Sequence, residues 1–486
     1  MATTIYADTT PLLEAIAASD RERIVQETIN LLGAQKVPAA KIAGRVGLAA
    51  LWGNADPHAL GALATVGRVS EWMRTIPVGP EPGDDTRRKL TPTYPLVQAF
   101  LAVADAVRKG LSEEHPSLPE PILPAELKDV QSVYSAVREA FWRRDLTMIR
   151  GLLMGYHATG ADYRSYQAAI AGALVHRYPE GGHPLIFALT GGHILDMAEW
   201  GDHLPPLIYW YPPLMLDTTP DTPASQIASE YASQPEHDLS WLRTRLSIPK
   251  EEGTGASFQQ ALQTGDGVAA CDAVLAALRN GATPRGVASG MALVVAGHIN
   301  AIPQGDSDRL VRIAHVLQYV HAVNLAMRQT QETLVFPMLY TAACAVNSLG
   351  RVGAPAVQGA GAAGSLVAGG LIPGAVLRSV EQQAASGDAG GALATARRYI
   401  QMGHQPSGLT GILATVAAQR DVAGDATASH VLPAVTAACE AYLMLPGAIA
   451  EKGQNALLDA AIRLASELRG ATTVADHVRA AIEAAI

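Results

Sequence analysis

Apolar residues recur at helical spacing along the whole chain, and this pattern predicts an all-α fold. Within the first 110 residues the apolar faces predict helices over Leu12–Leu32, Pro38–Trp52, His58–Met73 and Pro95–Gly110. Proline, glycine and charged residues gather between groups of such helices, as is typical of surface loops. The pattern therefore indicates a large helical body.

An aspartate recurs at nearly constant spacing, which indicates a tandem repeat. Its positions are Asp20, Asp145, Asp266 and Asp388, which are 125, 121 and 122 residues apart. Eighteen residues after each aspartate a helix is predicted to begin, and in three cases that residue is proline, which is favoured at the first helical position. The spacing predicts a tandem array of four homologous repeats of about 122 residues, built from stacked helical hairpins. The predicted boundaries are 1–125, 126–250, 251–375 and 376–486.

One histidine in each predicted repeat occupies the expected start of a later helix. These histidines are His58, His183, His315 and His430. On one interpretation each caps its helix and packs between repeats. On the other, equivalent positions of adjacent repeats lie side by side, so that His183 and His315 share a pocket. We expect these two histidines to hold or deprotonate a phenolic substrate, because imidazole is a base near neutral pH.

Composition narrows the classes of partner. The net charge of -9 and the absence of a Lys/Arg cluster argue against nucleic acid and against an anionic membrane surface. Three scattered cysteines are too few for a disulfide framework or a thiolate metal site. No basic segment followed by an apolar run opens the chain, so a cytoplasmic protein is expected.

The second predicted repeat differs from the others in its aromatic content. Twelve of the chain's 25 aromatic residues lie between Tyr134 and Tyr211. Aromatic rings with polar ends suit a pocket for a planar, partly polar ligand, and core packing is the alternative explanation. The candidate substrate-binding residues, one of them from the third repeat, are Phe187, Trp200, Tyr209, Tyr211 and Tyr319.

A metal site is a further hypothesis for this region. His193 and Asp196 share one face of the helix predicted to begin at His183, and His321 lies in the third repeat. Imidazole and carboxylate together suit iron, manganese or zinc. We therefore take His193, Asp196 and His321 as candidate metal ligands or orienting groups, although isolated histidines on apolar helices often belong to the core.

Other chemistries lack their sequence signatures. The chain has no His-Glu-x-x-His pair, no Walker loop and no Gly-x-Ser-x-Gly elbow. Gly359–Gly364 matches the dinucleotide fingerprint by letters, but no Val/Ile-rich strand precedes it. No flavin or nicotinamide fingerprint in good context is therefore found.

Two runs resemble a known family. Gly182–Ala188 and Ala314–Val323 are similar to the His-x-Leu-Ile and His-Ala-Val runs of questin oxidase-like proteins. The resemblance covers the second and third repeats and touches His183, His315 and His321. It implies an all-helical monooxygenase that inserts oxygen into an anthraquinone in a Baeyer–Villiger manner during polyketide biosynthesis. It also implies NADPH as the reductant, for which a separate electron-donor protein is one source.

Two functions remain open from the sequence. In the first, the protein is an oxygenase with an aromatic polyketide-like substrate in a pocket lined by histidine and aromatic residues. In the second, it is a non-catalytic helical-repeat scaffold that binds a partner protein. The uneven distribution of aromatic residues and histidines favours the oxygenase.

Overall fold

The computed structural model describes residues 1–486 with some gaps. Outside the description lie 1–7, 80, 113, 118, 124–129, 160–162, 200–203, 217–221, 246–252, 331, 354–355, 357–371, 424–425, 446–455 and 469. The fold is all-helical, and no strand occurs among the described residues. No helix in that part of the chain is long and apolar enough to cross a membrane.

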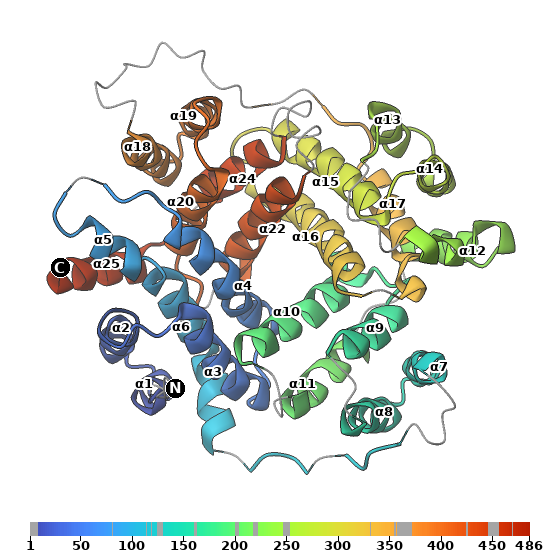
Figure 1. The fold of residues 1–486 in the computed structure, drawn as a ribbon, viewed down its shortest axis with the longest axis horizontal. Helices are drawn as coiled ribbons and strands as arrows, with labels where there is room; N and C mark the ends of the chain where they lie inside the picture. Colours follow the sequence, from blue (N-terminus) through green and yellow to red (C-terminus); the bar gives the residue numbers. More distant parts are fainter. Residues whose placement is uncertain are drawn as a thin grey trace.

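Four helices surround the centre of the molecule and contact one another in a closed order (Figure 1). They are α4 (Pro57–Arg74), α10 (His183–Met197), α16 (Ser307–Gln329) and α22 (Val431–Met444). Each packs on the next, and α22 packs back on α4. An open array would leave the first and last groups of helices apart, whereas here they meet.

Pairs of helices form the four corners of the molecule (Figure 1). These outer pairs are α1 (Thr10–Ala17) and α2 (Arg21–Ile29), α7 (Val130–Trp142) and α8 (Leu146–Ala158), α13 (Ala256–Gln263) and α14 (Gly267–Arg279), and α18 (Pro373–Ser386) and α19 (Ala389–Gln401). Between the corners and the centre lie α3 (Ala39–Trp52), α6 (Thr93–Ser112), α9 (Tyr163–Ala173), α11 (Leu204–Leu216), α15 (Pro284–Ala301), α17 (Met338–Asn347), α20 (Pro406–Ala418) and α24 (Ala456–Glu467). The remaining α-helices are α5 (Asp84–Leu90), α12 (Pro223–Ala232), α21 (Ala426–Ser429) and α25 (Thr473–Ala485).

The recurring aspartates are helix caps. They are the N-caps of α2, α8, α14 and α19, and each carboxylate accepts a hydrogen bond from the backbone N–H three residues later. The four N···O distances are 3.1, 2.9, 3.0 and 2.8 Å. Such a cap contributes about 1 kcal/mol. The helices predicted eighteen residues later, α3, α9, α15 and α20, begin at those positions or one residue after them.

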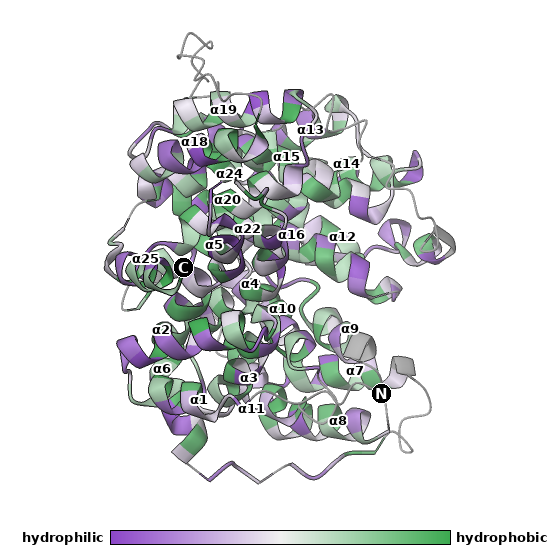
Figure 2. Ribbon diagram, turned by 60° about the vertical axis from the view of Figure 1, so that its left-hand side comes forward, coloured by the Kyte–Doolittle hydropathy of each residue, from purple (hydrophilic) through white to green (hydrophobic). Residues whose placement is uncertain are grey.

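One hydrophobic cluster extends from Leu12 to Ile482 and joins all these helices except the short α21. Hydrophobic and hydrophilic residues are interleaved along single helices (Figure 2), so each helix packs an apolar face inward. Very close helix contact requires small residues at some positions. At Gly53, at the end of α3, a Cβ atom would lie 1.8 Å from the carbonyl oxygen of Ala106 in α6.

Three boundaries differ from the sequence prediction. The helix predicted over Leu12–Leu32 is divided between α1 and α2, because Ser19 has a φ of 54° and Asp20 caps the second helix. The charged segment after α4, predicted as a loop, contains α5. The predicted boundary between 375 and 376 falls inside α18, which begins at Pro373.

Candidate active site

A cavity of about 310 Å³ lies among the four central helices. In every central helix the residues that lie three, six, seven and ten places after the recurring histidine line the cavity. Positions with this spacing share one face of an α-helix, so each central helix turns the equivalent face to the cavity. The third-position residues are Gly61, Ile186, Gln318 and Pro433, and the tenth-position residues are Arg68, His193, Leu325 and Glu440.

The four recurring histidines contact one another and are here called the histidine ring; His58, His183 and His430 line the cavity, and His315 packs against two of them. The centroid of His58 lies 4.9 Å from that of His183 and 4.6 Å from that of His430. His315 completes the ring, with centroids 5.2 Å from His183 and 4.2 Å from His430. The interpretation of these histidines as helix caps finds no support, since no side-chain cap hydrogen bond is formed by His183 or His430.

His315 was predicted at the start of a helix but lies in its third turn. Asp306 caps α16, and the helix begins at Ser307, eight residues before His315. The extra turns do not displace the imidazole from the ring, because the cavity-facing positions after it keep the same spacing as in the other central helices. The helix start therefore does not set the position of the ring; the packing of the central helices does.

Neighbouring groups orient three of the four imidazoles. The Nδ1 atom of His315 donates to the Val311 carbonyl oxygen at 2.9 Å, so a neutral His315 presents the lone pair of Nε2. That Nε2 lies 3.1 Å from Nδ1 of His430. A carboxylate lies near each of the other two, with Asp56 Oδ1 3.6 Å from His58 Nδ1 and Glu180 Oε2 3.7 Å from His183 Nδ1.

The surroundings lower the pKa values of three of the four ring histidines. Burial, followed by the nearby His315 and His58, lowers the pKa of His183 to about 3. Burial, together with the other three histidines, lowers the pKa of His430 to about 3 as well. Burial also lowers the pKa of His315. Neutral imidazoles at pH 7 offer lone pairs, which is the form that ligates metals.

The ring has the composition and spacing of a metal-binding site. Single ligand atoms of His58, His183 and His430 lie within 4.8 Å of one another, and they form the one such group of three among the described residues. Both ring nitrogens of His183 are buried without a hydrogen-bond partner in that part of the chain. A metal with bonds of about 2.1 Å holds neighbouring nitrogens about 3 to 4 Å apart, so modest side-chain rotation suffices.

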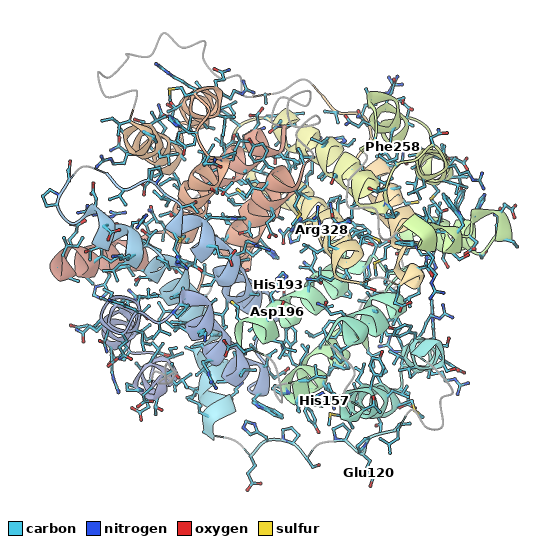
Figure 3. The ribbon with its side chains drawn as sticks, in the orientation of Figure 1. Glu120, His157, His193, Asp196, Phe258 and Arg328 are labelled. Atoms are coloured by element: carbon cyan, nitrogen blue, oxygen red, sulfur yellow. The ribbon has the colours of Figure 1, made fainter. Side chains whose placement is uncertain are left out.

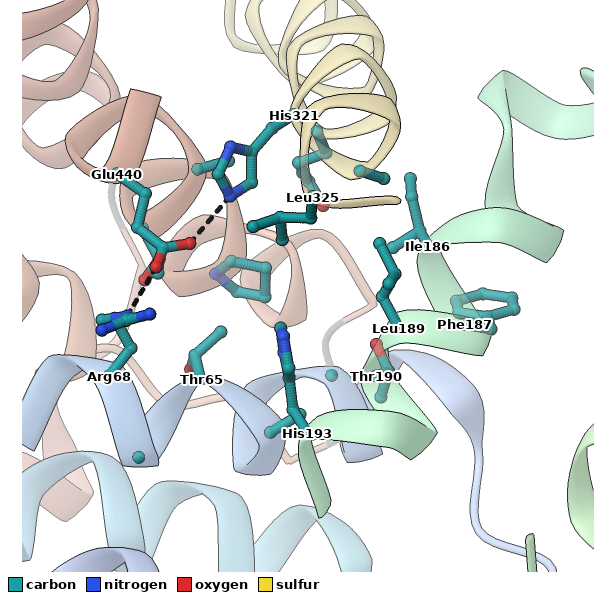
Figure 4. Close-up of a pocket in the computed structure, with 18 of the residues that line it drawn as sticks. Thr65, Arg68, Ile186, Phe187, Leu189, Thr190, His193, His321, Leu325 and Glu440 are labelled. Atoms are coloured by element: carbon teal, nitrogen blue, oxygen red, sulfur yellow. Dashed lines mark hydrogen bonds and ion pairs between the residues drawn. The ribbon is translucent and has the colours of Figure 1, made fainter. Parts of the chain in front are cut away.

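A second polar group lies farther along the central helices. Arg68 and Glu440 are ten residues beyond His58 and His430, which is about 15 Å along a helix from the histidine ring at 1.5 Å per residue. Glu440 lies between His321 and Arg68 (Figure 4), accepting from Nε2 of His321 at 2.7 Å and from Nε of Arg68 at 2.6 Å. Arg68 also pairs with Glu71 at 3.2 Å. Burial would raise the pKa of Glu440, but the hydrogen bond from His321 and the charge of Arg68 lower it to about 2.

His193 and Asp196 come from α10 and lie near the centre of the molecule (Figure 3). Both line the cavity, as does His321. Burial lowers the pKa of His193 and raises that of Asp196 to about 6. The structure does not bring these three side chains together as a ligand set, since the described groups with metal-binding spacing do not include them.

The predicted aromatic residues separate into two groups. Phe187 lines the cavity and stacks on His183, with centroids 5.0 Å apart and rings 14° from parallel. Tyr211 and Tyr319 are fully buried between helices and do not line the cavity. Tyr209 packs beside Trp52, also away from it. Core packing therefore accounts for Tyr211 and Tyr319, whereas Tyr209 is only partly buried and also lies under the guanidinium of Arg150; Trp200 lies outside the described residues.

Several residues of the site carry no motif of their own. Arg68, Gln318 and Glu440 line the cavity, and His58 and His430 complete the ring, yet none of the five was a candidate functional residue from sequence. A usable signal existed for Arg68 and Glu440, because each is ten residues after a recurring histidine, as His193 is. Counting all chemistry-bearing residues from those histidines would have grouped them.

Comparison of the chain with protein-family models, curated proteins and solved structures gives no match.

Proposed function

We propose that this protein is a metal-dependent oxygenase that acts on an aromatic, polyketide-like small molecule. The observation that carries the proposal is the meeting of four histidines beside a cavity large enough for a small molecule. A non-catalytic scaffold would have no use for buried imidazoles with unpaired nitrogens beside a cavity, because each unpaired buried polar atom costs stability. The scaffold is therefore the weaker alternative.

The proposed architecture is four homologous helical repeats closed into a ring. The four capping aspartates, the four helices that begin eighteen residues later, and the four sets of equivalent cavity positions all support it. Each repeat would contribute one histidine to the ring and one helix face to the cavity, and three of these histidines have the spacing of metal ligands. The repeats then differ at the tenth position, where Arg68, His193 and Glu440 are polar and Leu325 is not.

The histidine ring, rather than His193, Asp196 and His321, is the proposed metal site. Four imidazoles suit iron, copper, nickel or zinc, and of these iron or copper serves oxygen chemistry. When bound, such a metal would supply one-electron exchange with dioxygen. The Val311 carbonyl oxygen would fix the tautomer of His315, as outer groups commonly do for metal-binding histidines. Asp56 and Glu180 would orient His58 and His183.

The apolar wall of the cavity would hold the aromatic substrate. Ile186 and Leu189 of α10 point into the cavity (Figure 4), and Phe187 also lines it. Phe187, which stacks on His183, would also contact the substrate ring system. The resemblance to questin oxidase-like proteins supports a hydroxylated anthraquinone as substrate. Burial of such a flat molecule among helices excludes water from the reacting carbon.

The electron balance requires a second substrate. Insertion of one atom of dioxygen beside a ketone breaks a carbon–carbon bond, forms two carbon–oxygen bonds and releases the other oxygen atom as water. This consumes two electrons and two protons. We propose that NADPH supplies the electrons, through a donor protein if the reduced nicotinamide does not bind here.

Metal analysis tests this function. The purified chain should bind about one iron or copper ion per molecule, and His58→Ala and His430→Ala should each lower the occupancy at least tenfold. His477→Ala is the matched control, because His477 is exposed on α25. Oxygen uptake with hydroxyanthraquinones and NADPH should follow metal occupancy. Equal metal content in all four proteins, or oxygen uptake that ignores it, would refute the assignment.

A further inference from the structure

Six buried polar atoms of cavity-lining residues lack a hydrogen-bond partner within the described part of the chain: two belong to His183, and one each to Gln318, His321, Gln329 and Thr436. Three of these six, on α16 and α22, concern us here. Nδ1 of His321, Nε2 of Gln318 and Oγ1 of Thr436 are buried, and none forms a hydrogen bond within the described part of the chain. All three residues line the cavity. An unpaired polar atom next to an open space is a place where a ligand atom can bind.

The hydrogen bond between His321 and Glu440 determines what the free nitrogen can do. An ionised carboxylate only accepts, so Nε2 of His321 carries the hydrogen that Glu440 binds at 2.7 Å. In neutral His321, Nδ1 therefore presents a lone pair to the cavity. The carboxylate would also stabilise the imidazolium after Nδ1 takes a proton, as in other carboxylate–histidine pairs.

Glu440 is held in place from the other side. Arg68 donates to its second oxygen at 2.6 Å, and the side chains of Glu440 and His321 are only 9% and 8% exposed. The rotamers of both groups are therefore restricted. This removes much of the entropic cost of aiming Nδ1 at a substrate.

Gln318 precedes His321 by one turn of α16 on the same face. Its free Nε2 can donate to an oxygen atom that has just lost its proton to His321. A base and a hydrogen-bond donor thus converge on one ligand oxygen. His321 lies six residues beyond His315, which is about 9 Å along the helix from the histidine ring.

We propose that His321 is the general base of this site, that Glu440 is its positioning residue, and that the substrate is a phenol which the pair deprotonates. The O–H bond of the phenol breaks, its hydrogen moves to Nδ1 of His321, and the electron pair stays on the oxygen, which accepts from Gln318. The resulting phenolate pushes electron density into the ring that is to react with oxygen. This inference rests on the proposed function for the later oxidation, but not for the proton transfer itself.

Other ionisable groups also face His321. Glu440 faces it from α22, Arg68 and Glu71 from α4, and His193 and Asp196 from α10. The charge of Arg68 is offset by Glu440 and Glu71. The side chains of His193 and Asp196 form no hydrogen bond in the described part of the chain, so they are the competing bases that the experiment must separate from His321.

The test uses metal-free protein and a pair of dyes. 2-Hydroxyanthraquinone changes its visible absorption when its hydroxyl ionises, and 2-methoxyanthraquinone has the same ring system without the proton. The bound hydroxy dye should ionise at a pH at least about one unit below that of the free dye. The methoxy dye should bind with an unchanged spectrum at every pH.

Two variants locate the base. His321→Gln and Glu440→Gln should each bring the ionisation of the bound dye back to within about 0.3 pH units of the free dye. The first variant removes the base, and in the second a neutral glutamine cannot stabilise the imidazolium. His193→Gln and Asp196→Asn should keep the wild-type shift. Glu440→Gln preserves size and hydrogen bonding to Nε2, so it decides the question if circular dichroism shows that His321→Gln is unfolded.

The outcomes separate the two proposals. A wild-type shift retained in Glu440→Gln, a shift lost in Asp196→Asn or His193→Gln, or the absence of dye binding would each overturn the assignment of His321. A shifted dye in a protein that neither binds metal nor consumes oxygen would uphold the base and overturn the oxygenase. Metal-dependent oxygen uptake without a dye shift would do the reverse.

Discussion

Two histidines of the ring, His183 and His430, should make the metal-free protein sensitive to mild acid. His183 and His430 have pKa values lowered from 6.5 to about 3. On unfolding below pH 6.5 each takes up a proton that it cannot hold when folded. Stability is therefore fully present above pH 6.5 and falls as the pH is lowered toward 3.

The size of the effect follows from the two pKa values. A pH of 5 is about 1.5 units below the pKa of an unfolded histidine. Each of the two histidines therefore lowers the free energy of unfolding by about 2 kcal/mol, at 1.36 kcal/mol per unit. The pair then contributes a loss of about 4 kcal/mol between pH 7 and 5. Asp196 acts in the opposite direction, because its pKa is raised to about 6 and it gains a proton when folded; its side chain is exposed, so solvent screening keeps this offset small. Glu440, with a pKa of about 2, stays ionised in this range.

Urea unfolding of wild type and His430→Gln at pH 7 and pH 5 isolates one histidine. The variant should lose about 2 kcal/mol less than wild type between the two pH values, since Asp196 is common to both proteins and cancels. The exposed His477→Gln is the control and should match wild type. If His430→Gln loses as much stability as wild type, the lowered pKa of His430 is not the origin of the acid sensitivity.

Three further predictions concern the scaffold and the cavity. Gly53→Ala should lower the melting temperature and reduce the free energy of unfolding by about 1 to 3 kcal/mol, because the added Cβ would overlap the Ala106 carbonyl oxygen. Gly61→Ala is the control, since its Cβ would meet no atom within 4 Å, and urea unfolding should show no loss of stability. Asp388→Ala should cost about 1 kcal/mol in the same assay through loss of the α19 cap, and an unchanged midpoint would contradict the capping role. Leu189→Trp should fill the cavity, weakening binding of 2-methoxyanthraquinone at least tenfold by fluorescence titration, and unchanged binding would show that the dye binds elsewhere.

Local features of the fold could be predicted from the sequence because their causes are local. The helices expected eighteen residues after Asp20 and Asp388 begin at Ala39 and Pro406, whereas the capping role of these two aspartates was not predicted although each contacts an N–H only three residues away. Helical periodicity likewise identified the all-α class. The start of α16 was predicted at His315 but lies at Ser307, because Asp306 caps this helix well before its recurring histidine. The other central helices have no cap so far before theirs.

The functional assignments depended on longer-range contacts and were predicted less well. His183 and His315 were expected to share a pocket, and their rings lie 5.2 Å apart. His193, Asp196 and His321 were expected as metal ligands, and they line the cavity without forming a ligand set. Helical spacing predicted which residues share one face of a helix. It did not predict which residues of the other helices lie opposite that face.

The sequence by itself determined the helices, their caps and the recurrence of one histidine at regular intervals. Only the tertiary structure decided that the helices close on themselves, so that Arg68 and Glu440, 372 residues apart, form an ion pair beside the cavity. Ring closure follows from the sum of many small packing angles between helices, and no short segment encodes that sum. The chemistry of the centre is therefore a property of the closed ring, although each of its residues occupies a regular place in the chain.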